Sequence, residues 1–459
     1  MTIAPVADLL AALPSGLPVV EQRAALPAGF AAGGSAAGIK ASGRPDLALI
    51  RSTAGPAAVA AVFTPNAFAA APVRLSQANL SATSGDRRGR HGWTEIVIAT
   101  SGSANAATGP AGDADQVEIG RLVAEATGVA AERVQHLSTG IIGTRLPLDR
   151  VARGLRDLLP RLQAADSGLE AAAVALRTTD SVTKVATTSV ALSGKGGGSV
   201  NVTVGGIAKG VGMIHPRMAT MLAVVLTDAV VAPDVLAGLL RPAAVRTWDQ
   251  LSVDGDTSTN DTVLVLASGA AGTAAVEAGS AAASTLGSAI EAVARDLARQ
   301  QAADGEGATT LVTCQVSGAR DDAEARAVAR AVVASSLVKA AVHGRDPNWG
   351  RIAGAAGNAT LAEAAVLEAG GLAADEARER AGSPVVLDPD RLRIAIAGHL
   401  VFDGGAGGPV DFDKAAARAA MDGPELLIRL DLGVGDGTGE GFGCDLTEQY
   451  VIENSEYTT

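Results

Sequence analysis

The stretch KVATTSVALSGKGGGSVNVTVGGIAKG, residues 184–210, predicts the fold most directly. Two runs that alternate apolar with polar or small residues flank the glycine-rich turn at 195–198, a pattern typical of two antiparallel strands in a hairpin. The same turn superficially resembles a phosphate-binding loop, but that loop leads into a helix, whereas a strand-type run follows here. The sequence therefore favours a hairpin.

Strand-type and helix-type segments alternate on both sides of this hairpin. Strands are predicted over 46–52, 57–64, 71–76, 94–100 and 308–318. Helices are predicted over 148–159, 285–301 and 321–342, where apolar residues recur every three or four positions. Because hairpins and separated helices do not fit a repeated βαβ array, we expect an α+β fold of layered, mixed sheets.

The composition of the 459-residue chain favours a closely packed core. Hydrophobic residues make up 47% of the chain and charged residues 19%, which excludes a disordered protein. Aromatic residues account for only 2%, whereas glycine occurs 55 times. Alanine, valine and leucine must therefore fill the space between the layers.

Charge and residue usage exclude several classes of protein. The net charge of −12, without a basic run, indicates that nucleic acid is not a partner. The two cysteines form no motif and the five histidines are dispersed, so we expect neither disulfides nor a bound metal. The most apolar stretch, 221–240, contains Asp228 and Asp234, and the N-terminus lacks the basic region of a signal peptide. We therefore expect a soluble, cytoplasmic protein without a membrane span.

The acidic segment DGDTSTND, residues 254–261, resembles a calcium-binding loop only in composition. Counted from Asp254, such a loop would need glycine at its sixth position and glutamate at its twelfth, where this chain has Thr259 and Val265. We interpret the segment as a polar turn that is capped by its own side chains and lies close to a functional site.

LSTGIIG, residues 137–143, combines hydroxyl side chains with two glycines. A bend of this kind can present backbone N–H groups as an oxyanion hole for acyl transfer, although an ordinary turn is the commoner explanation. The chain has no G-x-S-x-G motif, which disfavours a standard serine hydrolase.

A second segment with candidate chemistry is KGVGMIHPRMATMLAVVLTDA, residues 209–229, in which Thr220 precedes an apolar run. Spacing alone leaves two interpretations of Thr220 open. It is either a structural residue entering a buried strand or a nucleophile that is released when the chain is cut before it. In the second case its own α-amine, with a pKa of about 7.7–8.0, would act as the general base.

Motifs in a fixed order give the chain a resemblance to a known family. They are AAGIK (36–40), DLALI (46–50), STGIIG (138–143), TTD (178–180), KGVGMIHPRMATML (209–222), VDGDTSTNDT (253–262), DGEGAT (304–309), SLVKAAVHGRDPNWGRI (336–352), GCDLT (443–447) and NSEYTT (454–459). From about Gly29 to Thr459 the sequence resembles the ornithine acetyltransferases, the bifunctional glutamate N-acetyltransferases of arginine biosynthesis.

The resemblance implies a self-cleaving acyltransferase with an N-terminal threonine nucleophile. Its fold would be a layered mixed-sheet α+β domain joined to a smaller second domain. The chain would be cut between Ala219 and Thr220 into an α chain, residues 1–219, and a β chain, residues 220–459. The two chains together would form both domains, and two α and two β chains would assemble into a heterotetramer.

The resemblance also implies residue roles. Thr220 would be the nucleophile, and Thr139 and Gly140 would stabilise the oxyanion. The implied substrate contacts are Thr178 or Thr179, Lys209, Thr220, Glu306, Asn454 and Thr459. In a ping-pong reaction the acetyl group would pass from N-acetylornithine to Thr220 and then to glutamate. No metal or bound cofactor is implied, and acetyl-CoA stays open as an alternative acetyl donor.

The chain departs from the family pattern in places. It has TSGSANAATG at 100–109 where NSGNANACTG is usual, and GFGCDLT at 441–447 where AWGCDLT is usual. The nearest alternative is an acyltransferase of the same fold in a secondary-metabolite pathway, acting on a different N-acyl amino acid or amine. An autoprocessed amidase or aminopeptidase, in which water is the acceptor, is a second alternative. A non-enzymatic binding protein is the third, and its function would be unchanged by Thr220→Ala.

Overall fold

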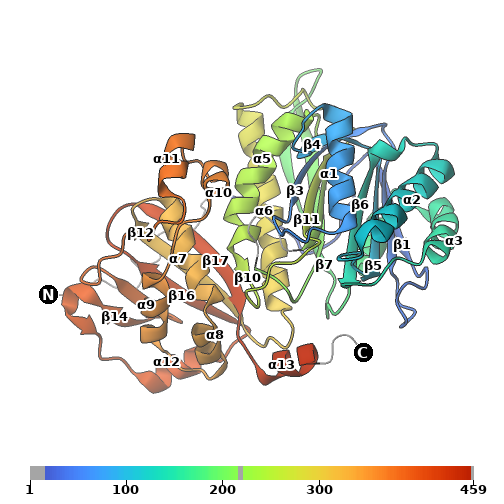
Figure 1. The fold of residues 1–459 in the computed structure, drawn as a ribbon. Coiled ribbons are helices and arrows are strands. Elements are labelled where there is room, and N and C mark those ends of the chain that lie inside the picture. Colours follow the sequence, from blue (N-terminus) through green and yellow to red (C-terminus); the bar gives the residue numbers. More distant parts are fainter. Residues whose placement is uncertain (1–15, 216–220, 456–459) are drawn as a thin grey trace.

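Two β-sheets packed face to face form the larger domain in the computed structural model, which describes residues 16–215 and 221–455 (Figure 1). The six-stranded sheet has the order β4-β3-β11-β9-β8-β7, and the four-stranded sheet has the order β1-β2-β5-β6. Their bounds are β1 Phe30–Ser35, β2 Leu47–Ser52, β3 Ala57–Phe63, β4 His91–Thr94, β5 Ile96–Ser103, β6 Val134–Ile141, β7 Lys184–Ser193, β8 Ser199–Lys209, β9 Leu222–Thr227 and β11 Thr262–Ala267.

Helices on the outer faces of these sheets complete four layers. Helices α5 and α6 cover the six-stranded sheet, and α2 and α3 cover the four-stranded sheet. Between the sheets lies a core composed mostly of alanine, valine and leucine, as the composition predicts, to which α1 and α4 contribute. The helices are α1 Ala71–Ser84, α2 Gly109–Thr127, α3 Leu148–Leu158, α4 Asp166–Leu176, α5 Pro233–Arg246 and α6 Ala281–Ala303.

A seven-stranded sheet in the order β10-β17-β12-β16-β13-β14-β15 forms the smaller domain, with α7, α8 and α9 packed on it (Figure 1). Its strands are β10 Leu251–Ser252, β12 Leu311–Ala319, β13 Arg393–Ile396, β14 His399–Asp403, β15 Gly408–Pro409, β16 Glu425–Asp431 and β17 Gly437–Cys444. The remaining helices are α7 Asp322–Ala334, α8 Ser336–His343, α9 Trp349–Gly357, α10 Ala364–Ala369, α11 Ala374–Arg380, α12 Lys414–Ala420 and α13 Glu448–Ser455. The α+β class with layered, mixed sheets and a smaller second domain is confirmed.

Helix α6 joins the two domains. One of its faces packs on the six-stranded sheet, and it also contacts β17 and β12 of the smaller domain (Figure 1). Arg295 of α6 forms an ion pair with Glu440 of β17, and Arg299 pairs with Glu425 of β16 at 2.8 Å. The residues that follow α6 therefore lie where both domains meet.

Several predictions about single elements are confirmed. In the hairpin at 184–210, β7 and β8 pair antiparallel from Lys184 opposite Ala208 to Ser193 opposite Ser199. The helices predicted over 148–159 and 285–301 are α3 and α6.

None of the helices within the described residues is long and apolar enough to cross a membrane.

Two predictions about single elements are wrong. Residues 71–76 begin helix α1 instead of forming a strand, because Pro72 is tolerated in a first helical turn and Val73 and Leu80 share a buried helical face. The single helix predicted over 321–342 is divided into α7 and α8. Ser335 has an extended backbone at this point, and its hydroxyl caps α8 by accepting from the Val338 N–H.

Candidate active site

A cavity of about 310 Å³ lies where the ends of β6 and β8 meet the segments before β11 and after α6. We call it the first cavity. It is lined by Ala104, Thr139, Gly140, Ile141, Ile142, Thr178, Thr179, Lys209, Gly210, Val211, Gly212, Met213, Met221, Leu222, Ser258, Thr259, Asn260, Asp261, Glu306 and Asn454. It thus contains seven of the predicted site residues: Thr139, Gly140, Thr178, Thr179, Lys209, Glu306 and Asn454. Ala219, Thr220 and Thr459 lie outside the described residues.

The sheet registers determine which side chains surround the start of β9. Lys209, the last residue of β8, pairs with Leu222, the first residue of β9. On the other side of β9, Leu222 pairs with Thr262, the first residue of β11. Lys209 and Asp261 therefore flank the point at which the chain enters β9, and Met221 there lines the cavity.

Lys209 is only 9% exposed, and its ammonium group donates a hydrogen bond to Thr139 Oγ1 at 3.1 Å. Burial lowers the pKa of Lys209, while the nearby carboxylates of Asp180 and Glu306 act in the opposite direction. Because an ammonium can only donate, Thr139 Oγ1 is the acceptor, and its own hydroxyl proton is left to point elsewhere. Thr139 can thus donate a hydrogen bond into the cavity.

The backbone around Thr139 is held in place from both sides. Asn260 donates from Nδ2 to the carbonyl oxygens of Ala104, at 2.6 Å, and Ser138, at 2.8 Å. Gly140 has φ +127°, and a Cβ at this position would come within 2.4 Å of the Gly102 carbonyl carbon. Only glycine fits there, so the oxyanion pair predicted from the sequence lies on a closely constrained stretch of chain.

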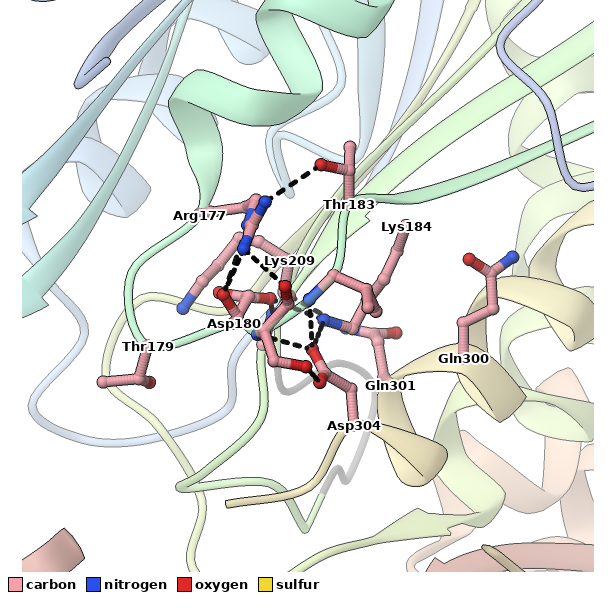
Figure 2. Close-up of polar contacts among 12 residues, drawn as sticks. Arg177, Thr179, Asp180, Thr183, Lys184, Lys209, Gln300, Gln301 and Asp304 are labelled. Atoms are coloured by element: carbon pink, nitrogen blue, oxygen red, sulfur yellow. Dashed lines mark hydrogen bonds and ion pairs between the residues drawn. The ribbon is translucent and has the colours of Figure 1, made fainter. Parts of the chain in front are cut away.

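A buried charge network supports the loop that follows β8 (Figure 2). The Lys184 ammonium is fully buried and contacts Asp180 Oδ1 at 2.8 Å and Asp304 Oδ2 at 2.6 Å. Asp180 Oδ1 also accepts from the Gly210 N–H at 2.8 Å. Burial by itself would raise the pKa of Asp180, but the positive charges of Lys209 and Lys184 outweigh it and hold that pKa well below its usual range.

The sequence does not predict this network as part of the site. Asp180 belongs to the TTD motif, for which the resemblance implies a role only of its threonines, and the pattern around Lys184 predicts only the start of a strand. Its link to Asp304 spans 120 positions and exists only in the folded chain. The only local signal was that a lysine opens a strand whose neighbours are apolar or small.

Glu306 is hydrogen-bonded to two other predicted substrate contacts, Thr179 and Asn454. Its Oε1 accepts from the Thr179 hydroxyl at 2.8 Å, and its Oε2 accepts from Asn454 Nδ2 at 3.0 Å. The adjacent Gly212 leaves room for the carboxylate, because a Cβ there would lie 2.3 Å from Glu306 Oε2. This wall of the cavity carries a negative charge, and Lys209 gives the cavity its positive one.

Asp261 is a residue of the first cavity that the sequence interpretation missed. It is 1% exposed, and its Oδ2 has no hydrogen-bond partner within residues 16–215 and 221–455. Burial raises the pKa of Asp261 well above its usual value. The prediction of a side-chain-capped turn at 254–261 is confirmed by Asp254, whose carboxylate accepts from the N–H groups of Ile214 and Asp256. That prediction did not identify which carboxyl faces the cavity.

The fold and the first cavity define a class: a four-layered α+β protein with a small polar site that is lined by a buried lysine, a carboxylate and a threonine hydroxyl. The family model described as "ArgJ family" matches residues 31–459, and the chain belongs to that family. The family resemblance given by the sequence motifs is thereby confirmed.

Curated relatives of similar length support the assignment. A protein of Thermosynechococcus vestitus named "Arginine biosynthesis bifunctional protein ArgJ" is 43% identical over 447 residues, covering 94% of this chain and 96% of the relative. One of the same name from Mycolicibacterium paratuberculosis is 42% identical over 444 residues, covering 96% and 97%.

Two solved structures are also similar. ArgJ from Bacillus halodurans is 35% identical with a TM-score of 0.44, covering 51% of this chain and 99% of that one. Ornithine acetyltransferase from Mycobacterium tuberculosis, solved in complex with ornithine, is 39% identical with a TM-score of 0.38, covering 44% of this chain and 99% of that one.

Proposed function

We propose that this protein is a self-cleaving acyltransferase that transfers the acetyl group of N-acetylornithine to glutamate. The observation that carries the proposal is the first cavity, in which Lys209 contacts Thr139 while Glu306 is bonded to Thr179 and Asn454. Family membership and the arginine-biosynthesis names of the relatives favour this reaction over a secondary-metabolite pathway.

In the proposed maturation the chain cuts itself between Ala219 and Thr220. The products are an α chain of residues 1–219 and a β chain of residues 220–459. The new α-amine of Thr220 would then lie in the same residue as the hydroxyl that it deprotonates. The register of β9 supports this site, because Met221 and Leu222 line the first cavity directly after Thr220 in the chain.

In the first half-reaction Thr220 Oγ attacks the acetyl carbonyl carbon of N-acetylornithine, and the Thr220 amine takes the hydroxyl proton. The Thr139 hydroxyl and the Gly140 N–H donate to the oxyanion that forms. Lys209 strengthens this donor, because its ammonium bonds to Thr139 Oγ1. The C–N bond then breaks, the proton passes to the leaving amine, ornithine departs and an acetyl ester stays on Thr220.

In the second half-reaction the amine of glutamate attacks the ester carbonyl and N-acetylglutamate leaves, which restores the Thr220 hydroxyl. We assign the cationic end of ornithine to Glu306, with Thr178, Thr179, Asn454 and Thr459 around it, and a substrate carboxylate to Lys209. No metal or bound cofactor enters this scheme, and acetyl-CoA is an alternative acetyl donor. Two α and two β chains in a cytoplasmic heterotetramer complete the proposal.

The test begins with denaturing mass spectrometry of the purified full chain, with Thr220→Ala and Thr220→Ser alongside. We expect fragments beginning at Met1 and Thr220 in the wild type, the same cut at lower yield in Thr220→Ser, and no cut in Thr220→Ala. Acetyl transfer from N-acetylornithine to glutamate should follow the same order.

Two results would contradict the proposal in different ways. A wild-type chain that is uncut yet active would remove the N-terminal threonine mechanism. A cut chain that hydrolyses N-acetylornithine equally fast with and without glutamate would instead identify an amidase, in which water replaces the amine acceptor.

A further inference from the structure

A second cavity, of about 610 Å³, lies between the smaller domain and the end of α5 in the larger domain. One wall is a single face of helix α7, which contributes Ala323, Arg326, Ala327, Arg330, Ala331 and Ala334. The residues 358–363, before α10, form the opposite wall, and Val245 and Asp249 belong to the larger domain. The alanines leave space that larger side chains would fill.

Arg326 is a buried cation for which the residues that the structure describes provide no paired counter-ion. It is only 7% exposed, and within residues 16–215 and 221–455 its guanidinium has no hydrogen-bond or ion-pair partner. An arginine side chain keeps its charge in proteins, and an uncompensated buried charge costs several kcal/mol. A site that keeps such a group is suited to an anion.

The carboxylates whose charges act on Arg326 are already engaged. Glu291 is paired with Arg246 at 2.6 Å, and Asp321 is paired with Arg380 at 2.7 Å. Asp322 accepts from the Thr438 N–H at 2.9 Å. None of these three is therefore available as the counter-ion.

The second arginine of the same helix face is used differently. Arg330 donates from Nη1 to the carbonyl oxygen of Asp249 at 2.8 Å, which ties α7 to the larger domain. Two carboxylate side chains, Asp249 and the exposed Glu363, also line the cavity. The negative charge of Glu363 disfavours a phosphate or another polyanion and favours a single carboxylate on Arg326.

We propose that the second cavity is a binding site for a small organic monocarboxylate with an apolar chain. The carboxylate would bind the Arg326 guanidinium in the bidentate geometry that suits this pair, and the chain would lie along the alanines of α7. The volume of about 610 Å³ is within the range of about 300–1,000 Å³ that is usual for ligand pockets. Because both domains line the site, an occupant would strengthen their packing.

The experiment uses the full-length protein and five probes: hexanoate, its shorter homologues butyrate and acetate, hexanol, and inorganic phosphate. Binding is measured by calorimetry and by the shift in Tm. We expect saturable binding of hexanoate with a rise in Tm, affinity that falls as the chain shortens to butyrate and acetate, and no saturable binding of hexanol or phosphate.

Variants separate the charge from the space. Arg326→Gln should weaken hexanoate binding at least tenfold, whereas Arg378→Gln, at an exposed arginine of α11, should leave it unchanged. Ala327→Leu keeps Arg326 but fills the cavity and should also abolish binding, so a folding defect of one variant does not decide the matter. The proposal would be overturned if the wild type does not bind hexanoate, or if Arg326→Gln and Ala327→Leu both bind it as tightly as the wild type does. It would also be overturned if phosphate binds as tightly as hexanoate.

Discussion

The two cavities differ in how the chain treats buried charge. Around the first cavity, Lys184 and Asp180 have partners in the chain, and Lys209 and Glu306 are held by hydrogen bonds to neighbouring side chains. In the second cavity Arg326 has no partner in the described part of the chain. Donors and acceptors that are fixed by partners before the substrate binds suit catalysis, which needs preorganised dipoles. A buried charge without a partner in the protein instead suits a site in which the ligand supplies that partner.

The largest expected effect concerns the paired charges near the first cavity, and it is a loss of stability. Lys184→Met would leave Asp180 and Asp304 buried without their cation, so we expect the free energy of unfolding to fall by about 3–5 kcal/mol. Urea unfolding measures this. Lys195→Met, in the exposed turn of the same hairpin, should change stability by less than about 0.5 kcal/mol. Equal effects of the two variants would contradict a stabilising role of the charge network around Lys184.

The next effect is on the chemical step. Thr139→Val keeps the size of the side chain but removes the hydroxyl that bonds to Lys209, so we expect kcat for acetyl transfer to fall by about 10²–10³. Steady-state kinetics with Thr144→Val as the control measures the loss, because Thr144 is exposed and lies outside the first cavity. An unchanged kcat would mean that the matched charges serve stability alone.

A pH titration distinguishes the network from its surroundings. His136 of β6 accepts from Gln116 through Nδ1 at 3.0 Å, which leaves its proton on Nε2. Burial lowers the pKa of His136 to about 3. In the unfolded chain His136 takes up a proton near pH 6.5, whereas in the folded chain it stays neutral. The free energy of unfolding therefore decreases as the pH is lowered, by about 2 kcal/mol from pH 7 to pH 5.

His136→Asn, which retains an acceptor for Gln116, should remove this part of the pH dependence of urea unfolding, whereas His399→Asn should not. The contribution of Asp180 has a different window. Its pKa is lowered, so that contribution persists to about pH 4 and is lost only as the pH falls further. Wild type and His136→Asn with parallel pH profiles would contradict the assignment.

The smallest expected effect concerns Arg326 in the second cavity, and it is a small change in stability. Arg326→Met removes a charge that has no partner among the described residues and fills its place with apolar atoms, so we expect stability to be unchanged or to rise by about 1 kcal/mol. Urea unfolding without added carboxylate measures it. A loss of more than about 2 kcal/mol would show that Arg326 is compensated and would break the contrast with Lys184.

The sequence predicts those features that depend on local patterns. Alternation and the glycine turn are sufficient for the hairpin of β7 and β8, and the motifs place seven candidate residues that do line one cavity. The failure at 71–76 has the same origin, because six residues are too few to distinguish period 2 from period 3.6 when Pro72 obscures the helix start.

The remaining features depend on contacts between distant segments. Asp261 is one of several polar residues in its turn, and only packing shows that its Oδ2 is buried without a hydrogen-bond partner among the described residues. Arg326 has the spacing of an ordinary charged helix residue. Its isolation arises because the segment 358–363 and Val245 approach α7 from elsewhere in the chain. No local pattern contains that information.

The strand order of the six-stranded sheet determines how the proposed α and β chains would stay associated after cleavage. β11 and β9 come from the part after residue 220, yet β3 flanks them on one side and β8 on the other, both from the part before it. Cleavage would therefore yield two polypeptides whose strands lie side by side in one sheet, and they could not separate without breaking the hydrogen bonds between β3 and β11 and between β8 and β9. A gene split at this point would need both products to be present for the sheet to form.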